Sequence, residues 1–283
     1  MDGLPDGGIF MKRGSKAMVL FLAAAILGGC TSGGAKKEAS SVDFQAKMEF
    51  RAPDPAAGKR PRILFVGNSH TFYNDLAGTF AKIAYDFGQK SDVYELSRGY
   101  YSLKQYADPE NEMGALFDKT VDGKKWDFVI LQENSATAFS NTAEEEMFPY
   151  TRLLDEKVKA NGGQTAFLMT WAPKEGMKEG FKKQSREELQ SMMVKNYTEI
   201  ADELEDLLIP AGIAFMRCAQ DYPEIELWNA DGMHPSPAGS YLAACTVYAV
   251  IYQQSPENCG YVGELDKEEA GKLQKVAAEL VLN

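Results

Sequence analysis

The chain has 283 residues, of which 45% are hydrophobic and 25% are charged, a composition typical of a globular protein with one sizeable core. Its formal net charge is -11, whereas proteins that bind nucleic acid present clustered lysine and arginine side chains. The charge therefore argues against nucleic acid as a partner, and the length predicts one domain of catalytic size.

The N-terminal segment has the parts of a secretory signal in their usual order. Residues 12–16 include three basic side chains, and residues 18–27 form an apolar run too short to span a bilayer comfortably. The run ends in "LGGC", which resembles the lipobox of bacterial lipoproteins; this resemblance implies cleavage before Cys30 and acylation of that cysteine. Since the first ten residues have no role in such a signal, Met11 is the expected start. A plain secretory signal, or an anchor helix with an incidental cysteine, is the alternative.

Three regions are expected from this pattern. They are a signal peptide over residues 1–29, a flexible tether over residues 30–60, rich in small and polar residues, and a catalytic domain over residues 61–283. A lipid anchor at Cys30 predicts membrane attachment in the bacterial cell envelope, on the periplasmic side or at the cell surface. The other cysteines are Cys218, Cys245 and Cys259, an odd number, so at least one thiol stays free or pairs between chains. Whether Cys245 and Cys259 form a disulfide is left open by the sequence.

From residue 62 the chain alternates short apolar runs with longer amphipathic ones. The runs of strand length are "RILFVG" (62–67), "DVYELS" (92–97), "WDFVILQ" (126–132), "QTAFLMT" (164–170) and "IAFMRC" (213–218). The helical patterns between them include residues 76–88, 143–163 and 185–208, the last opening on a capping box of Ser185 and Glu188. This alternation predicts a three-layer α/β/α fold with a mostly parallel five-stranded sheet.

Ligands of such a sheet bind at the carboxyl ends of its strands. The segments to inspect are therefore "GNSHT" after the first run, "RGYYS" after the second, "ENSAT" after the third and "WAP" after the fourth. A late polar loop, "WNADGMHPSPAG", leads into a long apolar helix and is expected at the same rim.

A serine in the first of these segments is the candidate nucleophile, and it needs a general base that a third group orients. The chain has only two histidines. His234 lies three residues after Asp231, a spacing that lets the carboxylate meet Nδ1 of the imidazole while Nε2 points outward. His70 is covalently next to Ser69, and adjacent side chains diverge. Geometry therefore favours His234 over His70 as the base of Ser69.

The order of these motifs resembles the SGNH (GDSL-like) hydrolases, from about residue 62 to residue 252. The resemblance implies a flavodoxin-like fold, with Ser69 as nucleophile, His234 as base and Asp231 as its orienting acid. It also implies an oxyanion hole made by Gly99, Asn134 and the backbone amide of Ser69. Attack on an ester carbonyl places negative charge on its oxygen, which such donors stabilise. No cofactor is implied.

Two motifs depart from the family pattern. The first block is "GNSH", where the family usually has Gly-Asp-Ser, and we expect Asn68 to organise the turn instead. The third block is "QENS", where the family has Gly-x-Asn-Asp, so either Asn134 or Gln132 is the side-chain donor. The "LQE" third block makes the chain most similar to a subgroup of secreted bacterial hydrolases.

Each residue also has a plainer interpretation. Ser69 would suit a helix N-cap, Asn134 an Asx-turn and Gly99 an ordinary turn. Asp231 and His234 would suit a polar surface turn. Five matches in the right order at strand ends favour the catalytic interpretation over coincidence.

Aromatic residues near these loops suggest a substrate lining. Tyr100 and Trp171 are the candidates, with Tyr101 and Trp228 beside them, although core packing is an equally good explanation for each. The cysteines and histidines show no spacing that predicts a metal site. The sequence thus predicts a serine esterase that removes a small acyl group, such as acetate, from a carbohydrate. A lipase, lysophospholipase or thioesterase is the rival enzyme, and a non-catalytic glycan-binding surface lipoprotein is the rival of another class.

Overall fold

The computed structural model describes residues 42–179 and 182–282. Its sheet has five parallel strands in the order β2-β1-β3-β4-β7. The strand bounds are β1 Arg62–Gly67, β2 Asp92–Ser97, β3 Phe128–Leu131, β4 Gln164–Leu168 and β7 Leu207–Ile209, with a separate hairpin of β5 Met177–Glu179 and β6 Lys182–Gln184. The predicted α/β/α fold with a five-stranded parallel sheet is confirmed.

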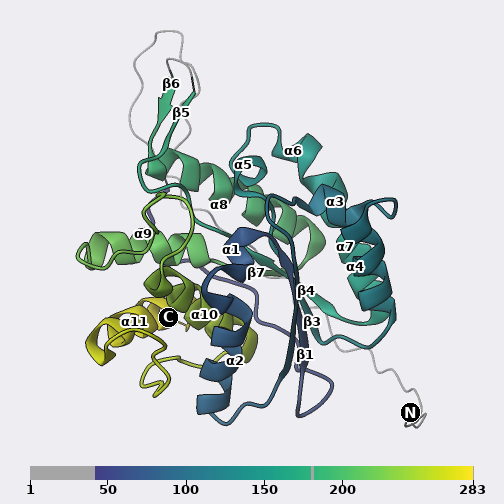
Figure 1. The fold of residues 1–283 in the computed structure, drawn as a ribbon, viewed down its shortest axis with the longest axis horizontal. Helices are drawn as coiled ribbons and strands as arrows, with labels where there is room; N and C mark the ends of the chain where they lie inside the picture. The colour runs from purple at the N-terminus through teal and green to yellow at the C-terminus, as the bar shows by residue number, and fades with distance from the viewer. Residues whose placement is uncertain (1–41, 180–181, 283) are drawn as a thin grey trace. The chain divides into compact units, whose positions relative to one another are not determined.

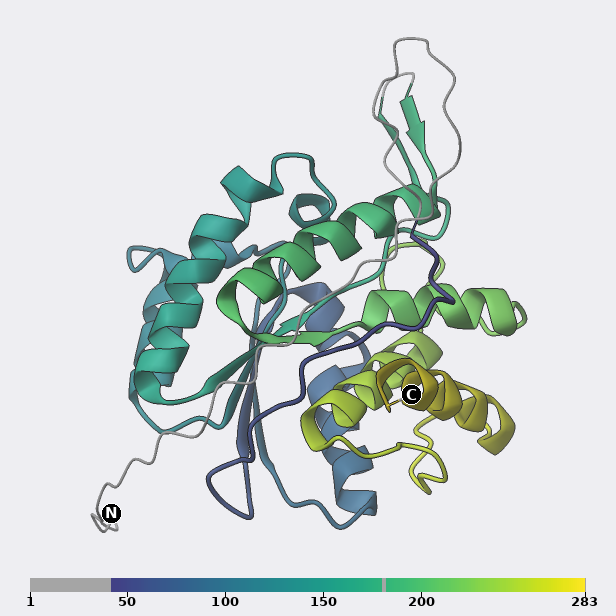
Figure 2. The same ribbon diagram turned by 180° about the vertical axis from the view of Figure 1, so that it is seen from behind.

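Helices cover both faces of this sheet (Figure 1). Helices α2, α10 and α11 lie on one face, and α4, α7 and α8 lie on the other, as the reverse view also shows (Figure 2). The helix bounds are α1 Ser69–Phe72, η1 Tyr73–Asp75, α2 Leu76–Asp86, α3 Leu103–Ala107, α4 Glu112–Asp122, α5 Ser135–Ala138, α6 Ala143–Glu146, α7 Phe148–Asn161, α8 Arg186–Leu204, α9 Ala211–Asp221, α10 Pro237–Tyr252 and α11 Lys267–Leu282.

Burial on both sides explains the apolar strands. The four residues of β3 are all buried, as are five of the six residues of β1. Helix α10 is apolar around most of its circumference because it packs between α2 and α11. Within the described residues, no helix has the length and apolarity needed to cross a bilayer.

The fifth predicted strand is wrong. Residues 213–218 lie in α9, and β7 is formed by the preceding "LLI" segment, which the periodicity had joined to the helix before it. Helix α8 ends at Leu204, and its C-cap Glu205 has a left-handed φ of 58°. Pro210 then separates the short strand from α9. The predicted capping box is confirmed: Ser185 and Glu188 exchange bonds of 3.1 and 2.7 Å.

The predicted tether is too long at its C-terminal end. Phe44 is buried in the core, and the Arg217 side chain donates to the carbonyls of Phe44 and Ala46 at 2.6 and 2.7 Å. Further along, Asp54 exchanges two hydrogen bonds with the Gln164 side chain on β4. The described part of the segment, from residue 42, therefore packs on the domain, because it carries apolar side chains and pairs its backbone. The predicted signal peptide, Cys30 and the rest of the predicted tether lie outside the described residues.

Three thiols lie in the described part of the chain. Cys218, Cys245 and Cys259 are all buried and free, so the structure contains no bond between Cys245 and Cys259.

Candidate active site

The site lies where the chain changes direction across the sheet. The chain leaves β1 for β2 on one side and later returns to β3 on the other, so the carboxyl ends of β1 and β3 form the switch point. Gly67 ends β1 against Gln132 and Thr71, which leave no room for a Cβ. Asn68 caps α1, its Oδ1 accepting from the His70 amide at 3.1 Å. Ser69 is thus the first residue of α1. The N-cap is Asn68, not Ser69 as in the plainer interpretation of the sequence.

The structure brings the three predicted residues into one hydrogen-bonded chain. Oγ of Ser69 lies 2.9 Å from Nε2 of His234, and Nδ1 of His234 lies 2.6 Å from Oδ2 of Asp231. A carboxylate only accepts hydrogen bonds, so Nδ1 carries the proton and Nε2 is left to accept from the serine hydroxyl. This arrangement is the one in which His234 can take a proton from Ser69.

The loop of residues 229–236 presets that geometry. Oδ1 of Asp231 accepts from the amides of Met233 and His234 at 2.9 and 3.0 Å, which folds the carboxylate back onto its own loop. The hydrogen bond from His234 and then that from the Met233 amide lower the pKa of Asp231 to about 2. The carboxylate is therefore ionised at neutral pH and fixes the imidazole tautomer.

His70 lies close to the triad in a different environment. Its side chain is buried, 5.5 Å from the His234 ring and 5.3 Å from the Trp171 ring, centroid to centroid. Burial, and next the neighbouring His234, lower the pKa of His70 to about 4, so its ring is neutral at neutral pH. A ring nitrogen bonds the backbone of Met233. His70 thus packs behind the loop that carries His234, with Ser69 bonded to the other histidine.

The predicted oxyanion donors follow β2 and β3, the two strands that flank β1 in the sheet. Asn134 caps α5, and its Nδ2 donates to the Tyr100 carbonyl at 3.3 Å. Gly99 lies in the turn after β2, where an added Cβ would meet only Phe72, at 4.0 Å. Tyr100 has a left-handed φ of 67°, a conformation uncommon outside glycine. The bond from Asn134 therefore joins the two predicted donor loops at a strained turn.

Gln132 is not an alternative donor in this structure. Its side chain is buried, and its Oε1 accepts from the Asn68 amide at 2.8 Å and from Thr71 Oγ1 at 2.9 Å. Its Nε2 donates to the Glu133 carbonyl. Because its amide is buried and bonded at both ends, Gln132 supports the turn of Ser69. The Asn134 side chain is partly exposed and stays the candidate donor.

Glu133 is a buried carboxyl that the sequence did not single out. It accepts from the Asn134 amide at 2.5 Å and from the Leu103 amide at 3.3 Å, so it connects the segments that follow β2 and β3. Burial raises the pKa of Glu133 to about 8 in spite of these backbone donors. The "QEN" motif therefore places two buried supports immediately before Asn134.

The aromatic lining is only partly as predicted. Trp171 is 1% exposed and stacks on Phe215 at 4.0 Å, so it is a core residue with no surface for a substrate. Trp228 is also buried, and its Nε1 donates to the Ala172 carbonyl at 3.1 Å. Tyr100 is 89% exposed next to Asn134 and remains a candidate contact for a substrate.

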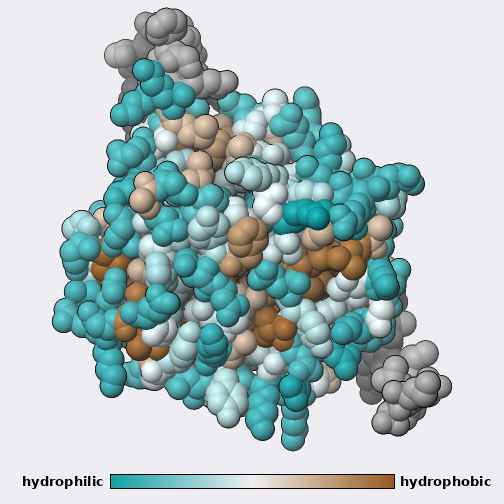
Figure 3. Space-filling view, in the orientation of Figure 1, coloured by the Kyte–Doolittle hydropathy of each residue, from teal (hydrophilic) through white to brown (hydrophobic). Residues whose placement is uncertain are grey.

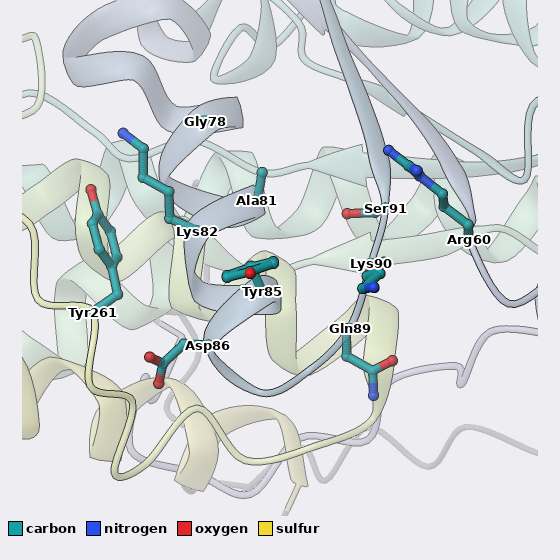
Figure 4. A pocket seen from close by; sticks show the side chains of 10 residues that line it. All are labelled: Arg60, Gly78, Ala81, Lys82, Tyr85, Asp86, Gln89, Lys90, Ser91 and Tyr261. Carbon is teal, nitrogen blue, oxygen red and sulfur yellow. The ribbon is translucent and has the colours of Figure 1, made fainter.

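Two of the cavities among the described residues differ in their position relative to Ser69. One of about 520 Å³ adjoins the triad and is lined by Lys174, Trp228, Asp231 and their neighbours. The other, of about 760 Å³, involves residues that precede β1 and β2, so it lies at the opposite end of the sheet from Ser69 (Figure 4). The face seen in Figure 3 is mostly hydrophilic, with apolar residues in small separate groups.

Solved structures share this fold. A protein from Slackia heliotrinireducens assigned to the SGNH hydrolases is 29% identical, with a TM-score of 0.59 over 68% of this chain and 98% of its own. The structural neighbours of this chain are SGNH/GDSL-like hydrolases. They include a protein from Parabacteroides merdae described as a GDSL-like lipase, 14% identical with a TM-score of 0.52 over 73% of this chain and 100% of its own.

The SGNH-like fold also matches a DUF4886 family protein from Bacteroides uniformis, 18% identical, with a TM-score of 0.62 over 77% of this chain and 93% of its own. No protein-family model and no curated protein matches the sequence. The resemblance drawn from the motifs thus agrees with the fold and with structural neighbours that are SGNH/GDSL-like hydrolases.

Proposed function

We propose that the SGNH-like domain is a serine esterase that cleaves a carboxylic ester through an acyl-enzyme. The observation that carries the proposal is the chain of hydrogen bonds from Ser69 through His234 to Asp231, at 2.9 and 2.6 Å. A hydroxyl, an imidazole of fixed tautomer and an ionised carboxylate in this order are the parts that nucleophilic acyl transfer needs.

The reaction has two halves. Oγ of Ser69 bonds to the ester carbonyl carbon while its proton passes to Nε2 of His234. The tetrahedral intermediate then collapses, the bond to the leaving oxygen breaks, and His234 returns the proton to that oxygen. In the second half His234 takes a proton from water, the resulting hydroxide attacks the acyl-enzyme, and Ser69 is released with its proton restored.

Negative charge on the intermediate needs donors on the side of the ester oxygen. The amide of Ser69 is at the first position of α1, where a backbone N–H has no partner within the helix. The Gly99 amide and Nδ2 of Asn134 are the further donors in the proposal, the second held by the Tyr100 carbonyl. Removing one such donor typically costs about 3 to 4 kcal/mol of transition-state stabilisation.

The test of this proposal is the variant Ser69→Ala. We expect it to lower turnover of p-nitrophenyl acetate by about 10³-fold or more, since the nucleophile is lost, while the far-UV circular dichroism spectrum stays the same. We also expect a fluorophosphonate probe to label the wild-type protein and not the variant. Retained turnover would contradict the role of Ser69, and no labelling of the folded wild-type protein would favour a glycan-binding domain without activity.

For the substrate, we propose a small acyl group on a carbohydrate. The exposed Tyr100 ring beside Asn134 supports a contact with a sugar ring, and the buried Trp171 adds no support. A panel that compares acetylated sugars with p-nitrophenyl esters of increasing chain length tests this. Activity that rises with acyl length would instead indicate a lipase or thioesterase.

For the location, we propose a lipoprotein of the bacterial cell envelope, attached through Cys30. The "LGGC" sequence after an apolar run supports this. Metabolic labelling with an alkyne fatty acid should mark the wild-type chain and not Cys30→Ala, and equal labelling would contradict the anchor.

A further inference from the structure

An aromatic ring lies flat against the imidazole of His234. The ring centroids of Tyr73 and His234 are 4.3 Å apart, and the two planes differ by 10°. Tyr73 also stacks on Phe72, with centroids 5.7 Å apart. Tyr73 comes from η1, four residues after Ser69, so the segment that supplies the nucleophile also covers one face of the proposed base.

The backbone that places Tyr73 is unusual. Asn74 and Asp75, the next two residues, both have left-handed φ values, 53° and 54°. Two consecutive residues of this kind cost conformational free energy and persist only where surrounding contacts hold them. The turn is therefore an arrangement that the rest of the site must maintain.

The contacts that hold the turn come from the loop and helix around the base. Nδ2 of Asn74 donates to the Pro235 carbonyl and to Oγ of Ser240, each at 2.9 Å. Oγ of Ser240 donates in turn to the Tyr73 carbonyl at 3.2 Å. Pro235 directly follows His234, so these bonds fix Tyr73 relative to the imidazole that it stacks on.

The chemistry of the step gives the stack a role. When His234 takes the proton of Ser69, its ring becomes a cation, and a cation over an aromatic face is attracted by the negative charge of that face. The other groups that face this ring are Asp231 at Nδ1, Ser69 at Nε2 and the neutral His70. Asp231 and Ser69 meet the edge of the imidazole at its two nitrogens, whereas Tyr73 covers one of its faces.

We propose that Tyr73 is a positioning residue for the base: its ring holds the His234 imidazole in plane towards Ser69 and stabilises the protonated form that arises during acyl transfer. This inference rests on the proposed function for its kinetic consequence. The effect on protonation of His234 does not depend on turnover, so it can be measured separately.

Proton NMR measures that effect directly, because the chain has only two histidines. The Hε1 signal of His234 is assigned as the one that survives in His70→Gln. We expect the titration midpoint of this signal to move to lower pH by about 0.5 to 1 unit in Tyr73→Leu, since the protonated ring loses its aromatic neighbour. Tyr73→Phe, which keeps the ring, should restore the wild-type midpoint.

The matched control is Tyr85→Leu. Tyr85 is 72% exposed and lines the cavity at the other end of the sheet (Figure 4), so the same substitution there should leave the His234 signal in place. If Tyr73→Leu does not fold, pentafluorophenylalanine at position 73 keeps the ring shape and reverses its charge distribution, and it should also lower the midpoint. A midpoint equal to that of Tyr73→Phe in the fluorinated variant, or in a folded Tyr73→Leu, would overturn the proposal.

Kinetics extend the test to the reaction. In Tyr73→Leu we expect kcat/KM on the pH plateau to fall about five- to thirty-fold, mostly through kcat, while the acidic limb of the profile moves to lower pH. A purely structural role would lower the plateau without moving that limb. If Ser69→Ala retains turnover, the proposed function fails, and the NMR titration still decides the role of Tyr73.

Discussion

The two halves of the site rest on buried titratable residues of opposite type. Behind Ser69, at the end of β1, lies His70, whose pKa burial lowers to about 4. Behind Asn134, at the end of β3, lies Glu133, whose pKa burial raises to about 8. At neutral pH both side chains are uncharged. The proposed base and its orienting acid, His234 and Asp231, are partly exposed, with 22% and 46% of their side-chain surface accessible.

This difference separates the buried residues that hold the backbone of the site from the partly exposed residues that change charge in the proposed reaction. A buried group titrates against the cost of desolvating its charged form, so it stays neutral and holds backbone groups in place. A partly exposed pair can change its charge at lower cost. The comparison predicts that the buried residues govern stability and its pH dependence, and that the exposed pair governs turnover.

The largest expected effect separates the two histidines. We expect His234→Ala to lower kcat/KM for p-nitrophenyl acetate by about 10³-fold or more, because the proposed base of Ser69 is lost. His70→Ala should lower it by roughly tenfold or less, since His70 contacts the loop of Met233 and not Ser69. Both are measured at pH 7.5 on protein shown to be folded by circular dichroism. Equal losses in the two variants would break the comparison.

Glu133→Gln tests the support behind Asn134. Between its ordinary pKa of 4.5 and its folded value of about 8, Glu133 keeps in the folded state a proton that the unfolded chain releases. Its contribution to stability is therefore complete below about pH 4.5 and is lost as the pH rises to 8. Glutamine does not titrate, so the variant should gain roughly 3 to 5 kcal/mol over wild type across that range.

Urea unfolding at pH 5, 6.5 and 8 measures this gain. The matched control is Glu145→Gln, on the exposed side of α6, which should show a small difference that hardly changes with pH. A Glu133→Gln difference that is the same at all three pH values would show that Glu133 is ionised in the folded protein.

The sequence predicts much of this arrangement, because strand ends fix where loops meet. Four of the five strands lie where their apolar runs indicate, and Ser69, His234 and Asp231 meet as the motif order implies. The fifth strand was missed because a three-residue strand has no periodicity of its own. The four correct strands and the meeting of the three side chains could be predicted from local sequence pattern and sheet topology alone.

The parts that failed depend on packing. Trp171 follows a strand as a lining residue would, but nothing in "TWAP" indicates that its ring stacks on Phe215 in the core. The position of Tyr73 depends on the left-handed backbone of Asn74 and Asp75. Asparagine and aspartate adopt this conformation more often than most residues, but the sequence does not indicate that two consecutive residues do so here. The "LQE" motif was visible, but its role as buried support required the contacts of Glu133.

The last prediction concerns His70, whose pH dependence has the opposite sign to that of Glu133. Its pKa falls from an ordinary 6.5 to about 4, so between these values the unfolded chain binds a proton that the folded protein does not. The contribution of His70 to stability is present above about pH 6.5 and is lost as the pH falls to 4, with a total of about 3 kcal/mol.

Because Glu133 titrates in an overlapping range, the measurement uses the Glu133→Gln background and compares urea unfolding with and without His70→Gln. We expect the stability advantage of the protein that keeps His70, measured against the His70→Gln protein, to become smaller as the pH falls from 7 to 4. Asp231, with a pKa of about 2, stays ionised throughout this range. A constant difference from pH 7 to pH 4 would mean that the folded protein accepts a proton on His70, and the site would then rest on a charged group.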